Sequence, residues 1–168
     1  MKKFLFAACT LLFVSSAIAQ QPATSASDVS NALQQKEQLT QNSLVKNLPF
    51  KNVGPTIMSG RVVDLAVNPD NPTEFYVGYA SGGVWHTINN GTTFTPVLDS
   101  SPTQNVGSLA VDWKNNTIWV GTGETWTRNS VSVGNGLFKS TDGGGNWKEI
   151  EGFENSERIA SIVINPNN

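Results

Sequence analysis

An internal repeat constrains the fold of this chain more than any other feature of its sequence. The run Arg61–Pro69 (RVVDLAVNP) resembles Asn105–Trp113 (NVGSLAVDW), which begins 44 residues later. It resembles Arg158–Pro166 (RIASIVINP) even more closely, after a further 53 residues. Self-similarity at a spacing of about 40 to 50 residues is typical of arrays built from one repeated structural unit.

Each unit contains further short runs that are rich in aromatic and β-branched residues and are separated by turn-forming residues, a pattern of strands without helical periodicity. A second and a third run recur in order, as Phe75–Gly78 and Ile118–Gly121 and as Gly83–Thr87 and Gly136–Ser140. A short fourth strand is predicted after each third run, near residues 95–98 and 148–150. The chain is therefore predicted to be all-β, with four strands in each unit.

Four-stranded units of this length are typical of the blades of a β-propeller. We expect blade 1 at about residues 56–99, blade 2 at about 103–151 and the start of blade 3 at about 157–168. One blade cannot cover both faces of its own sheet, and propellers have about four to eight blades. We therefore expect residues 49–168 to be the N-terminal part of a propeller that is not closed, a fragment whose partners include the missing blades of the same polypeptide.

The first 19 residues have the pattern of a secretory signal peptide. Lys2 and Lys3 precede an apolar run over residues 4–14, and the small residues of Ala17–Ala19 follow. The apolar run is too short for a membrane span, which needs about 20 residues. We expect cleavage after Ala19 and a secreted or periplasmic protein. A lipoprotein signal cleaved before Cys9, the single cysteine, is the alternative.

A polar segment over residues 20–48 separates the signal from the repeats, and it contains no aromatic residue. The interpretation we favour is a spacer. Asp28 is a candidate cap for a weak helix in which Val29, Ala32, Leu33 and Leu39 form a loose apolar stripe.

The turn between the third and fourth strands has the same design in both units. In the second unit it reads S-T-D-G-G-G-N-W, with Ser140, Asp142, Gly144 and Trp147 at the characteristic positions. Short Asx side chains accept hydrogen bonds from the backbone of their own turn, and glycine supplies a positive φ. The first unit carries a degenerate copy, at Thr87, Asn89, Gly91 and Phe94.

These turns resemble those of the Asp-box or BNR-repeat propellers, a group with sialidases, some endoglucanase-type glycoside hydrolases and the sortilin-type receptor domain. The chain is most similar to large secreted bacterial proteins described as sortilin-like or "glycosyl hydrolase" BNR-repeat proteins. The resemblance covers about residues 50–168. It is carried by the two turns and by Phe50–Pro55, Met58–Arg61, Ala80–Trp85 and Val120–Glu124. It implies that Asp142 is structural, at the rim away from known active sites.

The strongest candidate for a binding site is an insertion between the second and third strands of the second unit. This connection runs from Gly121 to Gly136 and is ten residues longer than its counterpart between Gly78 and Gly83. Aromatic and hydrogen-bonding groups of the kind it contains suit carbohydrate or peptide recognition. The candidate ligand-binding residues in the insertion are Glu124, Trp126, Arg128 and Asn129. A longer solvated loop that packs on its neighbour is the alternative.

Arg61 and Arg158 begin equivalent runs, so they are expected on the same end of the sheets as the insertion. Two guanidinium groups can clamp a carboxylate, which an arginine cluster does in sialidases. The sialidase lead motif Phe/Tyr-Arg-Ile-Pro is absent, because Val62 follows Arg61. Arg61 can equally form a structural bridge to Glu124 or Asp64, and we favour a structural or inter-blade role.

Several classes of function find no support in the sequence. Without Lys2 and Lys3 the chain has 9 basic and 13 acidic residues and no basic block, so nucleic acid is not an expected partner. Metal-ligand clusters, phosphate loops and nucleophile–base pairs are absent, and no cofactor or metal is expected. His86 aligns with Lys139 and is expected at an ordinary exposed strand position.

The sequence thus favours a secreted propeller scaffold that binds carbohydrate, peptide or protein on its loop face. The alternative is a glycoside hydrolase acting on polysaccharide, which needs two carboxylates about 5 to 9.5 Å apart. Only Glu124 and Asp64 are candidate acids on the loop face, so catalytic residues would lie partly outside the chain. A third possibility is that the fragment has no independent activity. Enzymatic activity is therefore left open.

Overall fold

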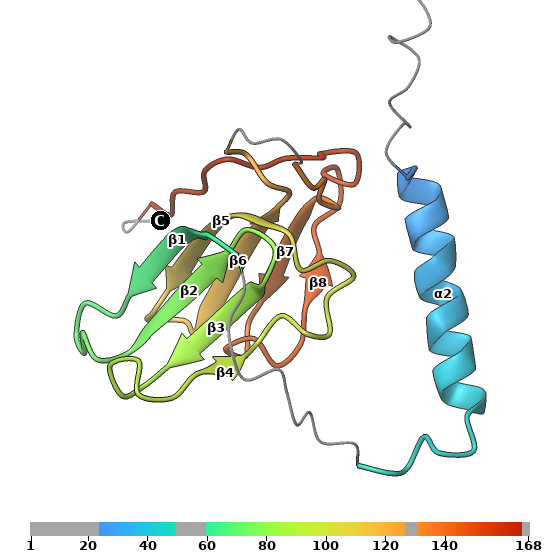
Figure 1. The fold of residues 1–168 in the computed structure, drawn as a ribbon, viewed down its shortest axis with the longest axis horizontal. Coiled ribbons are helices and arrows are strands. Elements are labelled where there is room, and N and C mark those ends of the chain that lie inside the picture. The colour runs from blue at the N-terminus through green and yellow to red at the C-terminus, as the bar shows by residue number, and fades with distance from the viewer. Residues whose placement is uncertain (1–23, 50–59, 127–130, 166–168) are drawn as a thin grey trace, which may run out of the picture.

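The computed structural model describes residues 24–49, 60–126 and 131–165. They form one helix and two antiparallel four-stranded sheets, and the sheets pack against each other (Figure 1). The predicted signal peptide, Phe50–Pro55, Met58, Arg128 and Asn129 lie outside the described residues. In the described residues, no helix is long and apolar enough to cross a membrane.

Each sheet has its strands in sequence order, as expected for two consecutive repeat units. The first sheet contains β1 (Val62–Val67), β2 (Phe75–Tyr79), β3 (Gly83–Thr87) and β4 (Thr95–Pro96). The second contains β5 (Val106–Asp112), β6 (Thr117–Thr122), β7 (Leu137–Ser140) and β8 (Lys148–Glu149). This arrangement fits two neighbouring blades of a propeller.

The two units agree in register as well as in strand order. Leu65 of β1 pairs with Val77, and its counterpart Leu109 of β5 pairs with Val120. A register shift falls between Val62 and Asp64 in β1 and between the equivalent positions, 106 and 108, in β5. A bulge bends a strand and re-aims the side chains that follow it. The shared bulge shows that the repeat extends to backbone irregularities.

The hydrophobic core lies between the sheets. One face of the first sheet and its following connection meet one face of the second, and the buried cluster is formed by Tyr76, Val84, Leu98, Val106, Leu109, Ile118 and Val120. Hydrogen bonds also cross the interface. Asp64 accepts one from the Leu109 N–H through Oδ2 (2.8 Å), and Trp147 donates one from Nε1 to the Val97 carbonyl (2.7 Å). Each sheet thus covers one face of its neighbour and leaves its other face outside this core.

The polar segment before the repeats contains helix α2 (Ala26–Asn42), which has no buried residue and stands beside the sheets (Figure 1). Its N-cap is Ser25, whose hydroxyl accepts a hydrogen bond from the Asp28 N–H (3.2 Å). The prediction that Asp28 caps the helix was wrong by three residues. Asp28 lies in the first turn, where a carboxylate is favoured by the helix dipole.

The third repeat does not form a strand within the described residues. Residues 157–165 have no regular secondary structure, although their sequence matches that of β1. A first strand obtains its ladder hydrogen bonds from a second strand, and no described segment supplies one here. Instead, the Ile159 N–H donates to the Thr122 carbonyl (3.1 Å), and the Ser108 hydroxyl donates to the Ile159 carbonyl (3.1 Å). The segment is therefore hydrogen-bonded to the second sheet, at the start of β5 and the end of β6.

Candidate functional site

The candidate site lies at the end of the sheets where the chain enters β1 and where β6 is connected to β7. In the first sheet the equivalent connection is a short turn over residues 80–82, whereas in the second it extends over residues 123–136. Antiparallel topology places the turns between strands three and four at the opposite end. The long connection and the repeated turns therefore occupy opposite ends of the sheets.

Arg61 and Glu124 form an ion pair between the two units. The Arg61 Nη2 atom lies 3.5 Å from Glu124 Oε1, with the arginine side chain 40% exposed and the glutamate side chain 0% exposed. The second carboxylate oxygen of Glu124 accepts a hydrogen bond from the Ser132 N–H (3.0 Å). The Glu124 N–H in turn donates to the Ser132 carbonyl (2.9 Å). Glu124 thus fastens the two arms of the connection to each other and to the start of β1.

Further contacts hold the base of the long connection, and sequence reasoning did not single out the residues that make them. Thr122 Oγ1 donates to the Gly136 carbonyl (2.7 Å) and accepts from the Asn135 N–H (2.7 Å). Asn105 donates from its side chain to the Val133 carbonyl (2.9 Å). The run Val120–Glu124, one of those that carry the family resemblance, was the available signal for this region.

Trp126 is the exposed aromatic residue of the connection. Its side chain is 64% exposed, only two positions beyond the buried Glu124. Large aromatic side chains that remain exposed in the folded protein are common on binding surfaces. Arg128 and Asn129, the other two predicted residues of the insertion, lie outside the described residues.

The structure does not show Arg158 meeting Arg61. Arg158 Nη1 lies 3.7 Å from Oε2 of its neighbour Glu157, and both side chains are exposed. The Glu157 carbonyl accepts a hydrogen bond from the Gly134 N–H (2.8 Å), which ties this segment to the long connection. Both arginines therefore lie near the connection, but each is paired with a different carboxylate.

Asp64, the other candidate acid, serves the backbone. Its Oδ1 accepts a hydrogen bond from the Leu65 N–H (2.9 Å), while its Oδ2 joins the two sheets through the Leu109 N–H. Neither Asp64 nor Glu124 presents a free carboxylate to a ligand in this arrangement. The pair of open acids that glycoside hydrolysis requires is not formed by these two residues.

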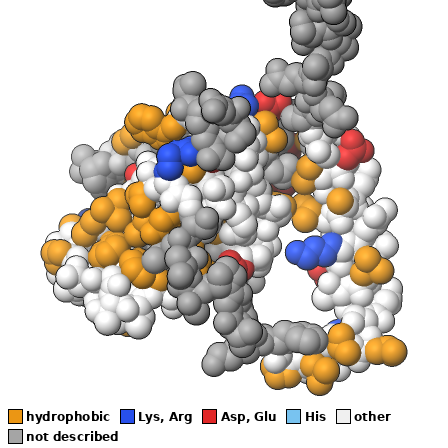
Figure 2. Space-filling view, in the orientation of Figure 1, with side chains coloured by type: hydrophobic (Ala, Val, Ile, Leu, Met, Phe, Trp, Pro, Cys, Tyr) orange, Lys and Arg blue, Asp and Glu red, His pale blue; other side chains and the backbone are white. Residues whose placement is uncertain are grey.

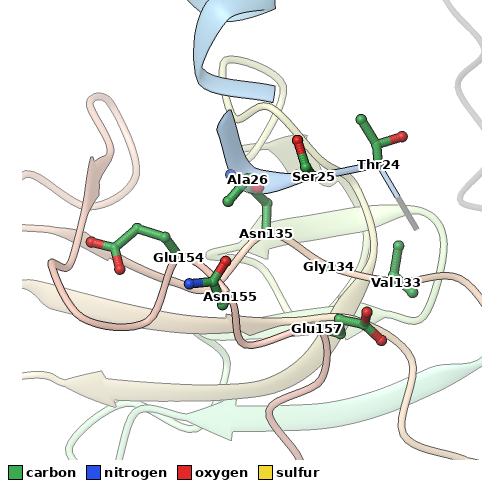
Figure 3. A pocket seen from close by; sticks show the side chains of 9 residues that line it. All are labelled: Thr24, Ser25, Ala26, Val133, Gly134, Asn135, Glu154, Asn155 and Glu157. Carbon is green, nitrogen blue, oxygen red and sulfur yellow. The ribbon is translucent and has the colours of Figure 1, made fainter. Parts of the chain in front are cut away.

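A cavity of about 220 Å³ lies between the start of helix α2 and the long connection. Figure 3 shows the segments around it: Thr24–Ala26 at the helix start, Val133–Asn135 of the connection, and Glu154, Asn155 and Glu157 from the chain that follows β8. Its walls carry two carboxylates and several amide or hydroxyl groups. The cavity adds further polar groups to the surface at this end of the second sheet.

The repeated turns at the opposite end share one hydrogen-bond pattern. Ser140 Oγ donates to Asp142 Oδ1 (2.7 Å) and accepts from the Gly144 N–H (2.9 Å), while Asp142 Oδ1 also accepts from the Asn146 N–H (2.9 Å). In the first unit Thr87, Asn89, Gly91 and Thr93 make the same set of bonds. The residues Asn90 and Gly91, and likewise Gly143 and Gly144, have positive φ.

The aromatic residues of these turns also differ in their contacts. The ring of Phe94 contacts Phe75 edge to face, with the centroids 6.1 Å apart, whereas Trp147 packs against the core between the sheets.

The pKa of Asp142 is lowered to about 2, mainly by hydrogen bonds from the side chain and then the backbone of Asn146, and also by the bond from Ser140. The Asp142 carboxylate is thus occupied with closing its own turn.

His86 does not occupy an ordinary exposed position, contrary to the prediction. Its side chain is 21% exposed, and its Nε2 lies 3.1 Å from Glu74 Oε1. The ring is stacked on that of Tyr76, because β2 and β3 place these residues opposite each other. Among the described residues, no group of three or more His, Cys, Asp or Glu side chains has the geometry to hold a metal ion.

No family model matches this sequence, and no curated protein matches it either. Among solved structures, the chain is similar to a GH74 enzyme of Niastella koreensis, with 26% identity and a TM-score of 0.42 over 54% of this chain. It is also similar to an ancestral GH74 enzyme, with 24% identity and a TM-score of 0.44 over 61% of this chain.

A third similar structure is the GH74 xyloglucanase from Xanthomonas campestris, with 17% identity and a TM-score of 0.40 over 52% of this chain. The matched region covers 14%, 14% and 13% of these three structures, respectively. The chain therefore spans about one seventh of the length of the structures that it matches.

Proposed function

We propose that this chain forms part of a secreted β-propeller that binds neutral carbohydrate at the end of the sheets where the long connection lies. The observation that carries the proposal is the exposed ring of Trp126, displayed two residues from the fully buried Glu124. Sugar rings stack on flat aromatic surfaces through their C–H faces. A Trp held on an anchored connection offers such a surface at a low cost in conformational entropy.

Arg61 supplies the polar part of the same surface. Its guanidinium remains 40% exposed while it contacts the Glu124 carboxylate, so some of its N–H groups are available to ligand hydroxyls. Glu124 is the positioning residue, because it holds both Arg61 and the backbone at Ser132. Arg158, tied to the long connection through Glu157, is included in the proposed surface, and Arg128 and Asn129 remain candidates from the sequence alone.

Charge favours a neutral ligand over an anionic one. Arg61 is balanced by Glu124 and Arg158 by Glu157, so neither arginine is an unopposed positive charge that would require a carboxylate or phosphate. The chain carries 13 acidic and 11 basic residues, which adds no general attraction for anions. Neutral oligosaccharides fit these groups better than sialic acids or acidic peptides do.

The proposal is tested by binding of the purified chain to an array of neutral gluco-, xylo- and manno-oligosaccharides, followed by titration calorimetry with the best binder. Trp126→Ala should weaken binding about fivefold or more, because stacking on an aromatic ring contributes about 1 kcal/mol. The matched control is Ile88→Ala, which removes an exposed apolar side chain at the opposite end of the sheets. Equal losses in both variants, or no binding to any neutral glycan, would overturn the proposal.

A turnover assay on the same oligosaccharides separates binding from hydrolysis. Because Glu124 and Asp64 are both engaged with backbone donors, we expect binding without release of product by this chain. Product release that survives in the Trp126→Ala variant would point to acids elsewhere and to the glycoside hydrolase alternative.

A further inference from the structure

The first sheet has an apolar face that is not covered by the second sheet. Strand pairing places Leu65 beside Val77 and Val67 beside Phe75, and Val77 in turn beside Trp85. We call the face formed by Leu65, Val67, Phe75, Val77 and Trp85 the open face. Leu65 is 52% exposed and Val67 is 42% exposed, whereas Phe75 and Trp85 are half-buried and Val77 at the centre of the face is buried. Figure 2 shows hydrophobic side chains gathered over this part of the first sheet.

The internal repeat predicts which kind of surface packs against the open face. Its residues correspond one by one to residues of the second sheet, namely Leu109, Val111, Ile118, Val120 and Phe138. Those residues pack against the first sheet: Leu109, Ile118 and Val120 belong to the buried core, and Val111 packs against it. The open face is thus the same type of surface, and within the described residues no second sheet packs on it.

The counterpart in the internal interface is the other face of the first sheet, which carries Ala66, Tyr76, Gly78, Val84 and His86. The equivalent positions of the second sheet form what we call the far face: Ala110, Trp119, Gly121, Leu137 and Lys139. It has the same small residues at equivalent positions. In place of the stacked rings of Tyr76 and His86, it has Lys139 Nζ 4.6 Å from the centre of the Trp119 ring.

We propose that the open face of one copy of this chain binds the far face of a second copy, in the geometry of the interface between its own two sheets. Such contacts are heterologous, because two different surfaces of each copy take part. Repeated head-to-tail contacts generate a ring when the rotation closes and an open chain when it does not. The proposal does not depend on the carbohydrate site.

Residues 157–165 lie where the incoming copy would bind, and would compete with it. Ile159 packs against Gly121 and its backbone is bonded to Thr122 and Ser108, so the segment lies over one end of the far face. In the internal interface, that place next to the first sheet is taken by the start of β5. The β1 strand of an incoming copy would therefore replace this single extended segment with a complete sheet.

The experiment is sedimentation velocity of the purified chain over a hundredfold range of concentration. We expect the average mass to rise with concentration for the unchanged chain. Leu65→Asp, on the open face, and Trp119→Ser, on the far face, should each remain monomeric. An equimolar mixture of the two variants should form dimers and nothing larger, because each variant retains one intact face. Ile159→Ser should strengthen association, because it weakens the segment that covers the far face.

Ile88→Asp is the matched control, because it places a charge on an exposed apolar position outside both faces and should associate like the unchanged chain. Val67→Ser replaces Leu65→Asp if circular dichroism shows that the latter does not fold. A folded chain that is monomeric at every concentration would overturn the proposal and leave the open face to other blades of a longer polypeptide. Dimers formed by Trp119→Ser alone would indicate a symmetric pairing of open faces and overturn it equally.

Discussion

The ring of His86 lies flat on the ring of Tyr76, with the two centroids 4.1 Å apart and the planes inclined by 9°. The second unit has the same arrangement in a different chemistry, since Lys139 lies over the ring of Trp119 at the equivalent strand positions. Cross-strand contacts between a ring and a neighbouring planar or cationic group stabilise a sheet on one face. The repeat therefore conserves a contact between strands two and three although all four residues differ.

The position of Tyr76 predicts a loss of stability at alkaline pH. Burial, and secondarily the negative charge of Glu74, raise the pKa of Tyr76 from 10.0 to about 12. Because the folded-state pKa exceeds the unfolded one, the stabilisation is complete below pH 10 and is lost as the pH rises towards 12. Urea unfolding followed between pH 9 and 12 should show this fall, and Tyr76→Phe should remove most of it. An identical pH profile in both proteins would contradict the prediction.

The second repeated turn predicts a loss of stability at acid pH. Hydrogen bonds from Asn146 and Ser140 lower the pKa of Asp142 from 3.8 to about 2. The pKa shift is opposite in direction to that of Tyr76. The stabilisation is therefore present above pH 4 and disappears as the pH falls towards 2. Asp142→Ala should therefore lower the free energy of unfolding at pH 7 and narrow the gap to the unchanged chain near pH 2. Asn89→Ala, in the uncharged turn, is the control and should show no such convergence.

Local sequence patterns predicted the strands because each strand has its own signal and a repeated copy. Leu65 and Leu109 recur in matching runs, and the turns at Asn89 and Asp142 carry the residues that their hydrogen bonds require. The start of the helix was predicted three residues too late. Ser25 and Asp28 are both favourable N-cap residues, and the sequence alone does not show which of them is the N-cap.

The candidate site was predicted less completely, because burial and pairing depend on contacts between units. Sequence spacing placed Arg61 and Glu124 at one end of the sheets and left Asp64 open as a partner, whereas the structure pairs Arg61 with Glu124. Glu124 also accepts a hydrogen bond from the Ser132 N–H, a backbone contact that has no sequence signature. His86 was misjudged because strand alternation gives the face on which a residue lies but not what stacks on it.

The tip of the second repeated turn predicts a strong effect of a single methyl group. Gly144 has φ +99°, and a Cβ atom added there would lie 2.6 Å from the Cβ of Val97 in the connection between the sheets. Gly152 has φ +90° but no atom within 4 Å of such a Cβ. Both alanine variants lose about 1–2 kcal/mol through backbone strain. Gly144→Ala should lose about 1–3 kcal/mol more, because the methyl group overpacks its site.

Denaturant midpoints of the two glycine variants, measured at equal slopes, give this difference directly. Gly152→Ala serves as the internal control for the cost of the left-handed backbone. Equal destabilisation of the two variants would show that the turn can move away from Val97, and the close contact between the turn and the connection would then not be rigid.

The ion pair between Arg61 and Glu124 predicts energetic coupling between the two units. Arg61→Leu removes the Arg61 guanidinium from the buried carboxylate, to which the Ser132 N–H still donates. Because the arginine is partly exposed and the pair is 3.5 Å apart, we expect a loss of about 1–3 kcal/mol, below the 3–5 kcal/mol typical of a fully buried pair. In the Glu124→Gln background, the same change should cost clearly less, because no buried charge remains. A double-mutant cycle from urea unfolding measures the coupling, and strictly additive effects would show that Arg61 and Glu124 do not stabilise each other.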